Sequence, residues 1–341
     1  MSVTMKDIAR ELGVSVVTVS KVLRGHSDIG GQTRQRVLKR IKELNYEPNP
    51  AARALVTGKT RTAGLIVPDL VHPFFAEVAT GLANTLRRRN YSLVISSSQE
   101  DPELERHEIK RLLGCRLDAL VVASTQPAGE SFRAMAEQKV PYILIDRAFL
   151  GIPANFVGVD DVEVGRMATE HLIAVGCQRI AHIRGPATST AIGRLEGYNQ
   201  ALSKHGLTPL QGYVPTGRSA DADSWSSGQE AMRALLKLSP PPDGVFCYND
   251  PIAIGAIDAV LQAGLRVPQD IAVMGCGNLH FDKSLRVPLT SIDQQSEAIG
   301  ERAGKLLLSI MGAKVPPQPK SIVLEPSLVP RESTRRNAHK R

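Results

Sequence analysis

The chain lacks the features that mark membrane-spanning, exported and disulfide-rich proteins. No apolar run approaches the roughly 20 residues that span a bilayer, and the N-terminal sequence MSVTMKDIAR has none of the apolar character of a signal peptide. The 4 cysteines are widely spaced and form no C-x-x-C pair. We therefore expect a cytoplasmic protein with reduced, mostly buried thiols and with no disulfide or metal site.

Catalytic signatures are also missing. The sequence has no G-x-S-x-G or H-E-x-x-H motif, and GHSDIGGQT, which follows residue 24, lacks the G-K-[ST] ending of a phosphate loop. The segment GCGNLH at 275–280 lacks the third glycine of a dinucleotide fingerprint, and the 8 histidines show no metal-ligand spacing. We expect neither catalysis nor a cofactor. An NAD-type enzyme and a transport sugar-binding protein are the alternatives.

What the sequence does contain is an uneven distribution of charge. Residues 1–60 hold 11 lysines and arginines against 5 aspartates and glutamates, and residues 331–341 hold 5 against 1. The intervening segment 61–330 is nearly neutral, with 26 against 28. A basic head on a nearly neutral body is typical of a protein that contacts a polyanion through its head. The alternative is a solvated basic surface.

The most informative segment, VTMKDIARELGVSVVTVSKVL at 3–23, has the pattern of a helix-turn-helix. Apolar residues recur at helical spacing on one face of a first helix, which Thr4 opens in a capping box with Asp7. Gly13 makes the tight turn, and Ser15 is suited to cap a second helix. The alternative is an unrelated three-helix bundle with a basic surface.

The second helix is expected to enter the major groove of DNA. The residues that we expect at the DNA from these two helices are Thr4, Ser15, Val16, Val17, Thr18, Ser20 and Lys21. The two valines cannot form hydrogen bonds with base edges but can contact thymine methyl groups, whereas Lys21 can donate to guanine O6 and N7. Partial core burial is the alternative for the valines.

A third helix is expected at about 32–45, with an apolar stripe at helical spacing. Pro48 and Pro50 end it. The segment AARALV at 51–56 is a short helix former that cannot hold a helix alone in water, because nucleation is costly. We therefore expect it to be mobile when free and helical when docked.

From residue 61 onward, short apolar strands alternate with amphipathic helices in two successive runs. Strands are expected at 62–67, 91–96, 118–123, 141–145, 179–184, 244–248 and 270–274, and helices near 74–90, 102–114, 129–139, 162–175, 190–206, 226–238 and 251–264. Two such runs predict an α/β core of two doubly wound parallel-sheet subdomains. The carboxyl ends of their strands would face each other across a ligand-binding cleft.

Polar residues that directly follow the expected strands are the candidates for this cleft. They are Asp69, Asp146, Arg147, Asp160, Asp161, Arg184, Tyr248, Asn249, Asp250 and the segment 275–278.

The chain resembles the lactose-repressor (LacI/GalR) family of transcription regulators from residue 3 to about residue 331. The resemblance is carried by T-x-x-D-I-A-x-x-x-G-V-S-x-x-T-V-S-x-V-L at 4–23, L-N-Y-x-P-N at 44–49 and A-R-x-L at 52–55. It implies a homodimeric repressor that binds a pseudo-palindromic operator in double-stranded DNA. It also implies that Leu55, with Arg53 beside it, enters the minor groove from a hinge helix, where an apolar wedge kinks DNA.

The resemblance implies further that the core is similar to periplasmic sugar-binding proteins and is crossed three times by the chain. The expected parts are a DNA-binding domain at 1–45, a hinge at 46–60, a core at 61–331 and a basic tail at 332–341. Crossings near 160, 292 and 321 would assign about 61–160 and 293–320 to the N-subdomain, and about 161–291 and 321–331 to the C-subdomain.

A small effector would bind between these subdomains and control operator affinity. By resemblance, Arg194 in GRLEGY binds the effector, Asn249 is a pocket position, and Phe74 and Phe75 form a wall. The effector candidates are Phe74, Arg147, Asp160, Arg194, Trp225, Asn249 and Gly277. The alternatives are a surface ion pair for Arg194 and plain core packing for the two phenylalanines.

Gly277 stands where sugar-responsive members of the family place an aspartate. Removing that carboxylate while keeping Arg147 and Arg194 favours an anionic effector, and the segment also resembles gluconate-type members. We expect a sugar acid, with a neutral sugar as the alternative. The C-terminal RESTRRNAHKR lacks apolar heptads, which predicts a dimer rather than a tetramer.

Overall fold

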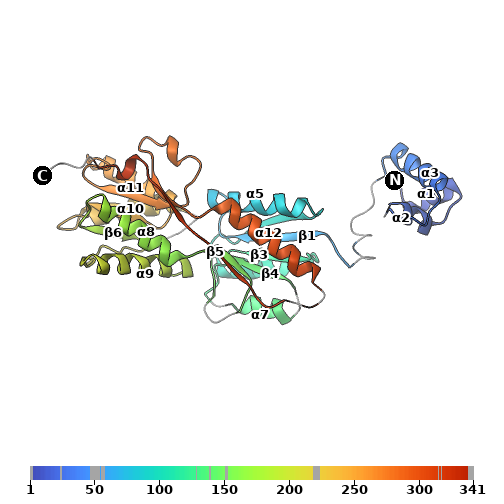
Figure 1. The fold of residues 1–341 in the computed structure, drawn as a ribbon, viewed down its shortest axis with the longest axis horizontal. Coiled ribbons are helices and arrows are strands. Elements are labelled where there is room, and N and C mark those ends of the chain that lie inside the picture. The colour runs from blue at the N-terminus through green and yellow to red at the C-terminus, as the bar shows by residue number, and fades with distance from the viewer. Residues whose placement is uncertain are drawn as a thin grey trace. The chain divides into compact units, whose positions relative to one another are not determined.

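The computed structural model describes residues 3–23, 25–46, 54, 58–127, 129–137, 140–149, 153–217, 223–313, 315 and 317–336. The chain divides into two compact units, residues 1–60 and 61–341 (Figure 1). Among the described helices, none has both the length and the apolar character needed to cross a membrane.

The described helices of the first unit are α1 (Met5–Leu12), α2 (Val16–Leu23) and α3 (Gly31–Glu43). Thr4 opens α1 in the predicted capping box, because its hydroxyl accepts from the Asp7 amide while the Asp7 carboxylate accepts from the Thr4 amide. Ser15 Oγ accepts from the Thr18 amide at 3.0 Å and so opens α2. Apolar side chains from all three helices form the core of this unit.

The predicted hinge helix at 51–56, including Arg53 and Leu55, lies outside the described residues apart from Ala54. The Gly58 amide donates to the Ala54 carbonyl at 2.8 Å, which is the spacing of one helical turn. The roles expected of Arg53 and Leu55 stay predictions.

The first sheet of the core has the strand order β10-β5-β4-β3-β1-β2, and its strands are parallel. These strands are β1 (Thr62–Val67), β2 (Ser92–Ser97), β3 (Ala119–Val122), β4 (Tyr142–Ile145), β5 (Phe156–Val159) and β10 (Ser321–Leu324). Its helices are α5 (Pro73–Arg87), α6 (Pro102–Gly114), α7 (Glu130–Glu137) and α12 (Ser296–Gly312). Side chains alternate between faces, so that Leu65 packs with α5 and α12 while Ile66 packs with α6 and α7.

The second sheet has the order β11-β9-β8-β7-β6, parallel except for β11. Its strands are β6 (Ile180–Ile183), β7 (Gly244–Cys247), β8 (Ala272–Cys276), β9 (Thr290–Asp293) and β11 (Ser327–Val329). The helices are α8 (Asp161–Ala174), α9 (Ser189–Lys204), α10 (Ser224–Leu236) and α11 (Asp250–Gln262), with short 3-10 turns η1 (Asp282–Ser284) and η2 (Glu332–Thr334). Both sheets carry helices on two faces, which confirms the predicted pair of doubly wound subdomains.

The chain passes between the two sheets after β5, after β9 and after β10. The third crossing follows Leu324, later than the expected position near residue 321. Residues 321–324 pair in parallel with β5 of the first sheet before the chain enters β11 of the second. The segment 321–331, which was expected in the C-subdomain, therefore begins in the first sheet, which belongs to the N-subdomain.

Candidate DNA-reading surface and effector cleft

Helix α2 of the first unit presents an outward surface of small side chains. Val16 and Val17 are 38% and 61% exposed, whereas Val19 and Val22 are buried. The Thr18 hydroxyl lies 2.9 Å from Ser15 Oγ. The two valines are therefore exposed to solvent, and their contact with thymine methyl groups stays a prediction.

Lys21 is the one charged residue of α2, and it is paired. Its Nζ lies 2.5 Å from Asp28 Oδ2 in the loop that leads to α3. The side chains of Lys21 and Asp28 are 38% and 53% exposed, so both reach solvent. Asp28 was not predicted from the sequence as a DNA-reading residue.

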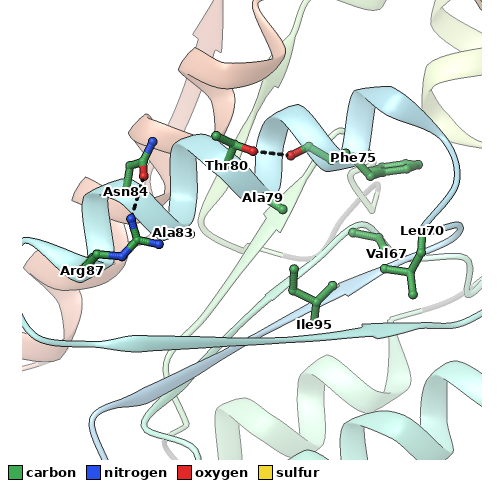
Figure 2. Close-up of a pocket in the computed structure, with 10 residues that line it drawn as sticks. Val67, Leu70, Phe75, Ala79, Thr80, Ala83, Asn84, Arg87 and Ile95 are labelled. Atoms are coloured by element: carbon green, nitrogen blue, oxygen red, sulfur yellow. Dashed lines mark hydrogen bonds between the residues drawn. The ribbon is translucent and has the colours of Figure 1, made fainter.

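A cavity of about 380 Å³ lies between α5 and the strands β1 and β2. Figure 2 shows Val67, Leu70 and Ile95 on one side, with Phe75 and Ala79 of α5 facing them. Two of the lining side chains, Leu70 (54%) and Ile95 (43%), are exposed, and Val71 (85%) follows Leu70 in the chain. Because β2 is an edge strand, this apolar surface adjoins unpaired backbone groups, a combination typical of interaction surfaces.

At the carboxyl ends of the strands, Arg194 is buried and fully engaged within the second subdomain. Its Nε donates to Asp161 Oδ1 at 2.9 Å, its Nη1 donates to the Tyr248 carbonyl, and its Cζ lies 4.6 Å from the centre of the Tyr248 ring. A Cβ at Gly165 would lie 2.0 Å from the Arg194 carbonyl oxygen. Glycine there lets α8 approach α9 closely enough to join these residues.

Burial raises the pKa of Asp161 to about 6, although the Arg194 charge and hydrogen bond oppose this shift. Asp146 adds to the upward shift as a like charge. The carboxyl opposite Arg194 therefore titrates close to physiological pH. It can accept the guanidinium's hydrogen bond or give it up to another acceptor.

Asn249 connects the two subdomains. Its Oδ1 caps α11 by accepting from the Ile252 amide at 3.0 Å, which leaves Nδ2 directed at His72 Nε2, 3.2 Å away. Since an amide nitrogen only donates, His72 Nε2 is the acceptor and its ring proton resides on Nδ1. His72 directly precedes α5 and was missed by sequence reasoning, although its place after β1 was a usable signal.

Arg147 lies at the carboxyl end of β4, 5% exposed, with Nε 3.6 Å from Asp146 Oδ2. One residue further, the Ala148 amide donates to Ser189 Oγ at 3.0 Å. Because Ser189 begins α9, this is a second polar contact between the subdomains.

Glu105 of α6 is a buried carboxylate that sequence reasoning also missed. It accepts from Ser124 Oγ at 2.6 Å, from the Thr125 amide and hydroxyl at 2.6 and 2.8 Å, and from Gln126 Nε2 at 2.7 Å. These bonds satisfy its charge without a cation. They fix the loop at the carboxyl end of β3, beside Arg147.

The backbone and a neighbouring side chain explain why residue 277 is a glycine, independently of any effector. The φ of Gly277 is +139°, and a Cβ there would lie 2.8 Å from Asp250 Oδ2. The Asp250 carboxyl is fully buried and accepts from Ser291 Oγ at 2.6 Å. Burial and the neighbouring Asp250 carboxylate raise the pKa of the Asp282 carboxyl well above its usual range. A carboxyl group is thus present beside Gly277, supplied from α11.

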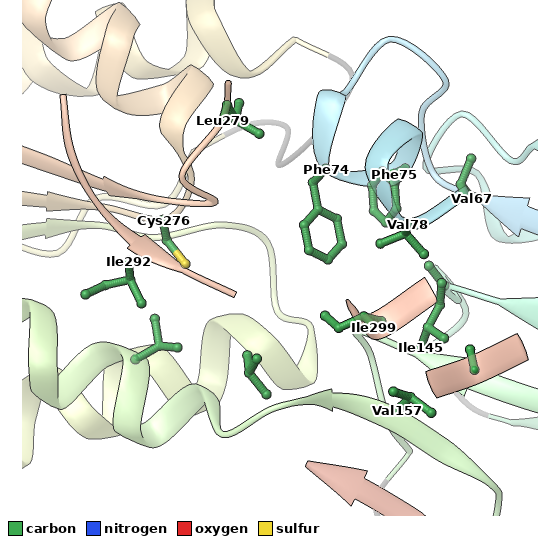
Figure 3. Packing of buried hydrophobic residues seen from close by; sticks show 14 of the residues in the cluster. Val67, Phe74, Phe75, Val78, Ile145, Val157, Cys276, Leu279, Ile292 and Ile299 are labelled. Carbon is green, nitrogen blue, oxygen red and sulfur yellow. The ribbon is translucent and has the colours of Figure 1, made fainter. Parts of the chain in front are cut away.

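The remaining effector candidates are dispersed. Asp160 caps α8 by accepting from the Val162 and Glu163 amides at 3.0 and 3.1 Å. Trp225 is 47% exposed on α10. Phe74 is buried in an apolar cluster that also contains Cys276, Leu279 and Ile292 of the second subdomain (Figure 3). The cluster places Phe74 at the junction of the subdomains and agrees with the core alternative.

Of the cysteines, Cys177, Cys247 and Cys276 are buried and Cys115 is exposed, in line with the expectation of mostly buried thiols. Burial raises the pKa of Cys177 to about 12, which keeps this thiol protonated and unreactive. Within the described ranges, no group of three or more His, Cys, Asp or Glu side chains is placed to hold a metal ion.

Comparison with known proteins agrees with this architecture. Residues 4–49 match the family described as bacterial regulatory proteins, lacI family, and residues 169–334 match a periplasmic binding protein-like domain. The chain is 32% identical to the HTH-type transcriptional repressor PurR of Mannheimia succiniciproducens over 98% of this chain and 99% of that protein. It is 36% identical to the ribose operon repressor of Escherichia coli K12, over 89% and 92%.

Solved structures give the same result. The lac repressor dimer bound to operator and the anti-inducer ONPF superposes with a TM-score of 0.86 at 26% identity, over 98% of this chain and 99% of that one. The complex of the transcriptional regulator CelR with cellobiose gives 0.74 at 30% identity, over 97% and 99%.

Together, the helix-turn-helix head and the two-subdomain core define a DNA-binding transcriptional regulator. The chain belongs to the LacI family of bacterial regulatory proteins. The relatives that it matches along most of its length are named as transcriptional repressors.

Proposed function

We propose that the chain is a cytoplasmic repressor whose affinity for an operator is set by a small effector bound between the two core subdomains. The observation that carries this proposal is the contact between His72 and Asn249, 3.2 Å apart at the facing strand ends of the two sheets. Ligands of parallel α/β sheets bind at such ends. One solved relative is described with an operator and an anti-inducer, and another with cellobiose.

Control of the head would pass through the subdomain junction. An effector that takes the Nδ2 donor of Asn249 competes with His72 and thereby changes the contact between subdomains. The hinge segments of two protomers would then pair or separate, with Leu55 entering or leaving the minor groove. A coupling of about 1–3 kcal/mol changes operator affinity by about 5–150-fold, as an inducer or as a corepressor.

The proposed effector is a sugar acid or a sugar. Arg147 and Arg194 favour an acid, because a guanidinium binds a carboxylate in two-point fashion. The pairing of Arg194 with Asp161 favours a neutral sugar, since an acid would have to displace that carboxyl group. A ribose repressor and a cellobiose complex among the relatives also favour the neutral sugar.

The test is a thermal-shift titration of the full chain with D-gluconate, D-ribose, cellobiose and hypoxanthine. The expected result is stabilisation by one of the sugars or the acid, lost in Arg194→Lys and weakened in Asn249→Ser. The serine keeps an N-cap acceptor for α11 but removes the amide donor. A ligand that binds both variants as tightly as wild type would contradict a site between the subdomains.

The apolar surface over α5 and β2 is proposed as the dimer interface. It combines exposed Leu70, Val71 and Ile95 with a cavity of about 380 Å³ (Figure 2). A second copy of the chain would cover both the apolar side chains and the edge of the sheet.

A further inference from the structure

Helix α2, which we expect to enter the major groove, has a single charged side chain, and that side chain is paired with a carboxylate. In VVTVSKVL the charged residue is Lys21, whose Nζ lies 2.5 Å from Asp28 Oδ2. A lone lysine at DNA attracts phosphates whatever the sequence. A lysine paired with a carboxylate loses most of that attraction, so the pair adds little to sequence-independent binding of DNA.

The loop that carries Asp28 is fixed relative to α2. The Gly25 amide donates to the Val22 carbonyl at 3.0 Å, and the His26 amide donates to the Lys21 carbonyl at 3.1 Å. Arg34 of α3 donates to the His26 carbonyl. The Lys21 ammonium holds the pKa of Asp28 below its usual range, so the carboxylate stays ionised at neutral pH. A donor and an acceptor are therefore held side by side.

A donor beside an acceptor matches one base-pair edge better than the others. In the major groove a G·C pair shows two neighbouring acceptors, guanine N7 and O6, followed by the cytosine N4 donor. An A·T pair shows its N6 donor between the acceptors N7 and O4. An ammonium spanning two acceptors, with a carboxylate directly next to it, fits the first order and not the second.

We propose that Lys21 and Asp28 read one G·C base pair together, with Lys21 donating to guanine and Asp28 accepting from the cytosine amino group. Asp28 thereby joins the DNA-reading residues, and it supplies the charged counterpart to the methyl-contacting Val16 and Val17. The pair favours the G·C edge and opposes others, because Asp28 would meet the thymine O4 acceptor or its methyl group.

The test begins with selection of an operator by the full-length protein from randomised DNA duplexes. The expected half-site contains one invariant G·C pair. Replacing it by A·T lowers affinity about 5–150-fold, while inosine·C, which keeps the whole major-groove edge, binds as G·C does. N4-methylcytosine, which places a methyl group where the major-groove hydrogen was, weakens binding by the wild-type protein.

Variants then assign the cytosine contact to Asp28. Asp28→Ala should bind the N4-methylcytosine and unmodified duplexes equally, and Asp28→Asn, which keeps an acceptor oxygen, should retain part of the discrimination. Glu11→Gln is the matched control, because it also removes one negative charge from the head. The Glu11 carboxylate lies away from α2 and pairs with Arg40 at 2.6 Å. This variant should preserve the full discrimination.

Two results would overturn the proposal. One is wild-type binding that is insensitive to N4-methylcytosine at every selected G·C pair, a measurement that needs no variant to fold. The other is an equal rise in affinity for all duplexes in Asp28→Ala and Glu11→Gln, which would mean that Asp28 only reduces the positive charge of the head.

Discussion

Asp161 links the stability of the core to pH at the scale of one side chain. Its pKa rises from 3.8 to about 6 on burial. Between these values the folded state holds the proton more tightly than the unfolded chain does. The contribution of Asp161 to the free energy of unfolding is therefore full below about pH 4 and is lost as pH rises through about 6.

We expect this loss to vanish in Asp161→Asn. The free energy of unfolding of wild type, relative to that of the variant, should fall by at most about 1.4 kcal/mol per pH unit between pH 4 and 6. Urea unfolding of the full chain at each pH, followed by the fluorescence of Trp225, the only tryptophan, measures this difference in free energy. Asp270→Asn is the control, since Arg266 lowers the pKa of Asp270 to about 2. Parallel pH profiles for wild type and Asp161→Asn would contradict the assignment.

Gly277→Ala tests whether the nearby Asp250 carboxyl group requires a glycine at position 277. The positive φ and the 2.8 Å approach to Asp250 Oδ2 strain any side chain there. We expect a loss of at least about 1 kcal/mol in the free energy of unfolding. Gly114→Ala, with nothing within 4 Å of the added Cβ, should be neutral or stabilising. Equal effects of both substitutions would show that Gly277 is unconstrained.

At the scale of elements, the sequence predicted best those segments whose pattern is local. The strand at 62–67 is one buried apolar run, and its bounds were predicted without error. Four strands were missed, namely β5 (FVGV), β9 (TSID), β10 (SIVL) and β11 (SLV). In each of them glycine or a polar residue interrupts or borders a short apolar run, so that the local pattern is hard to tell from a loop. α12 was omitted although Ile299, Ala303 and Leu307, all buried, repeat at helical spacing.

The capping box of α1 gives a test at this scale. Thr4→Ala removes the hydroxyl that accepts from the Asp7 amide, and should destabilise the head by about 1 kcal/mol. Hydrogen exchange of the α1 amides in the full chain measures the change. Thr4→Ser, which keeps the hydroxyl, should exchange as wild type does. Faster exchange in Thr4→Ser than in Thr4→Ala would be inconsistent with the cap.

At the scale of the whole molecule, contacts between distant segments decided what the sequence could not. Strand ends indicated Asn249 and Arg147, but His72 bonds to a residue 177 positions away. Glu105 carries no local signal in the sequence, because its partners lie in the loop 124–126, which only the fold brings over it. The local sequence pattern shows where a strand ends. Which side chains meet at that end depends on how distant segments pack together.

The proposed dimer interface is tested by Ile95→Asp, which places a charge in the apolar surface over α5 and β2. We expect light scattering to give the mass of one chain, 36.9 kDa, for the variant and twice that for wild type. Val323→Asp is the control, because Val323 is 55% exposed on β10, the opposite edge of the same sheet. A dimeric Ile95→Asp protein would exclude this surface.

The apolar cluster of Figure 3 limits how the two subdomains can move. Phe74 of one subdomain and Leu279 and Ile292 of the other belong to the same buried cluster. A jaw-like opening would expose these side chains to water, at about 25 cal/mol for each Å² of apolar surface. Sliding of one subdomain across the other keeps them covered, which is the shear type of domain motion. We therefore expect that any movement between the subdomains keeps the buried area of this cluster nearly constant and depends on the shapes of its side chains.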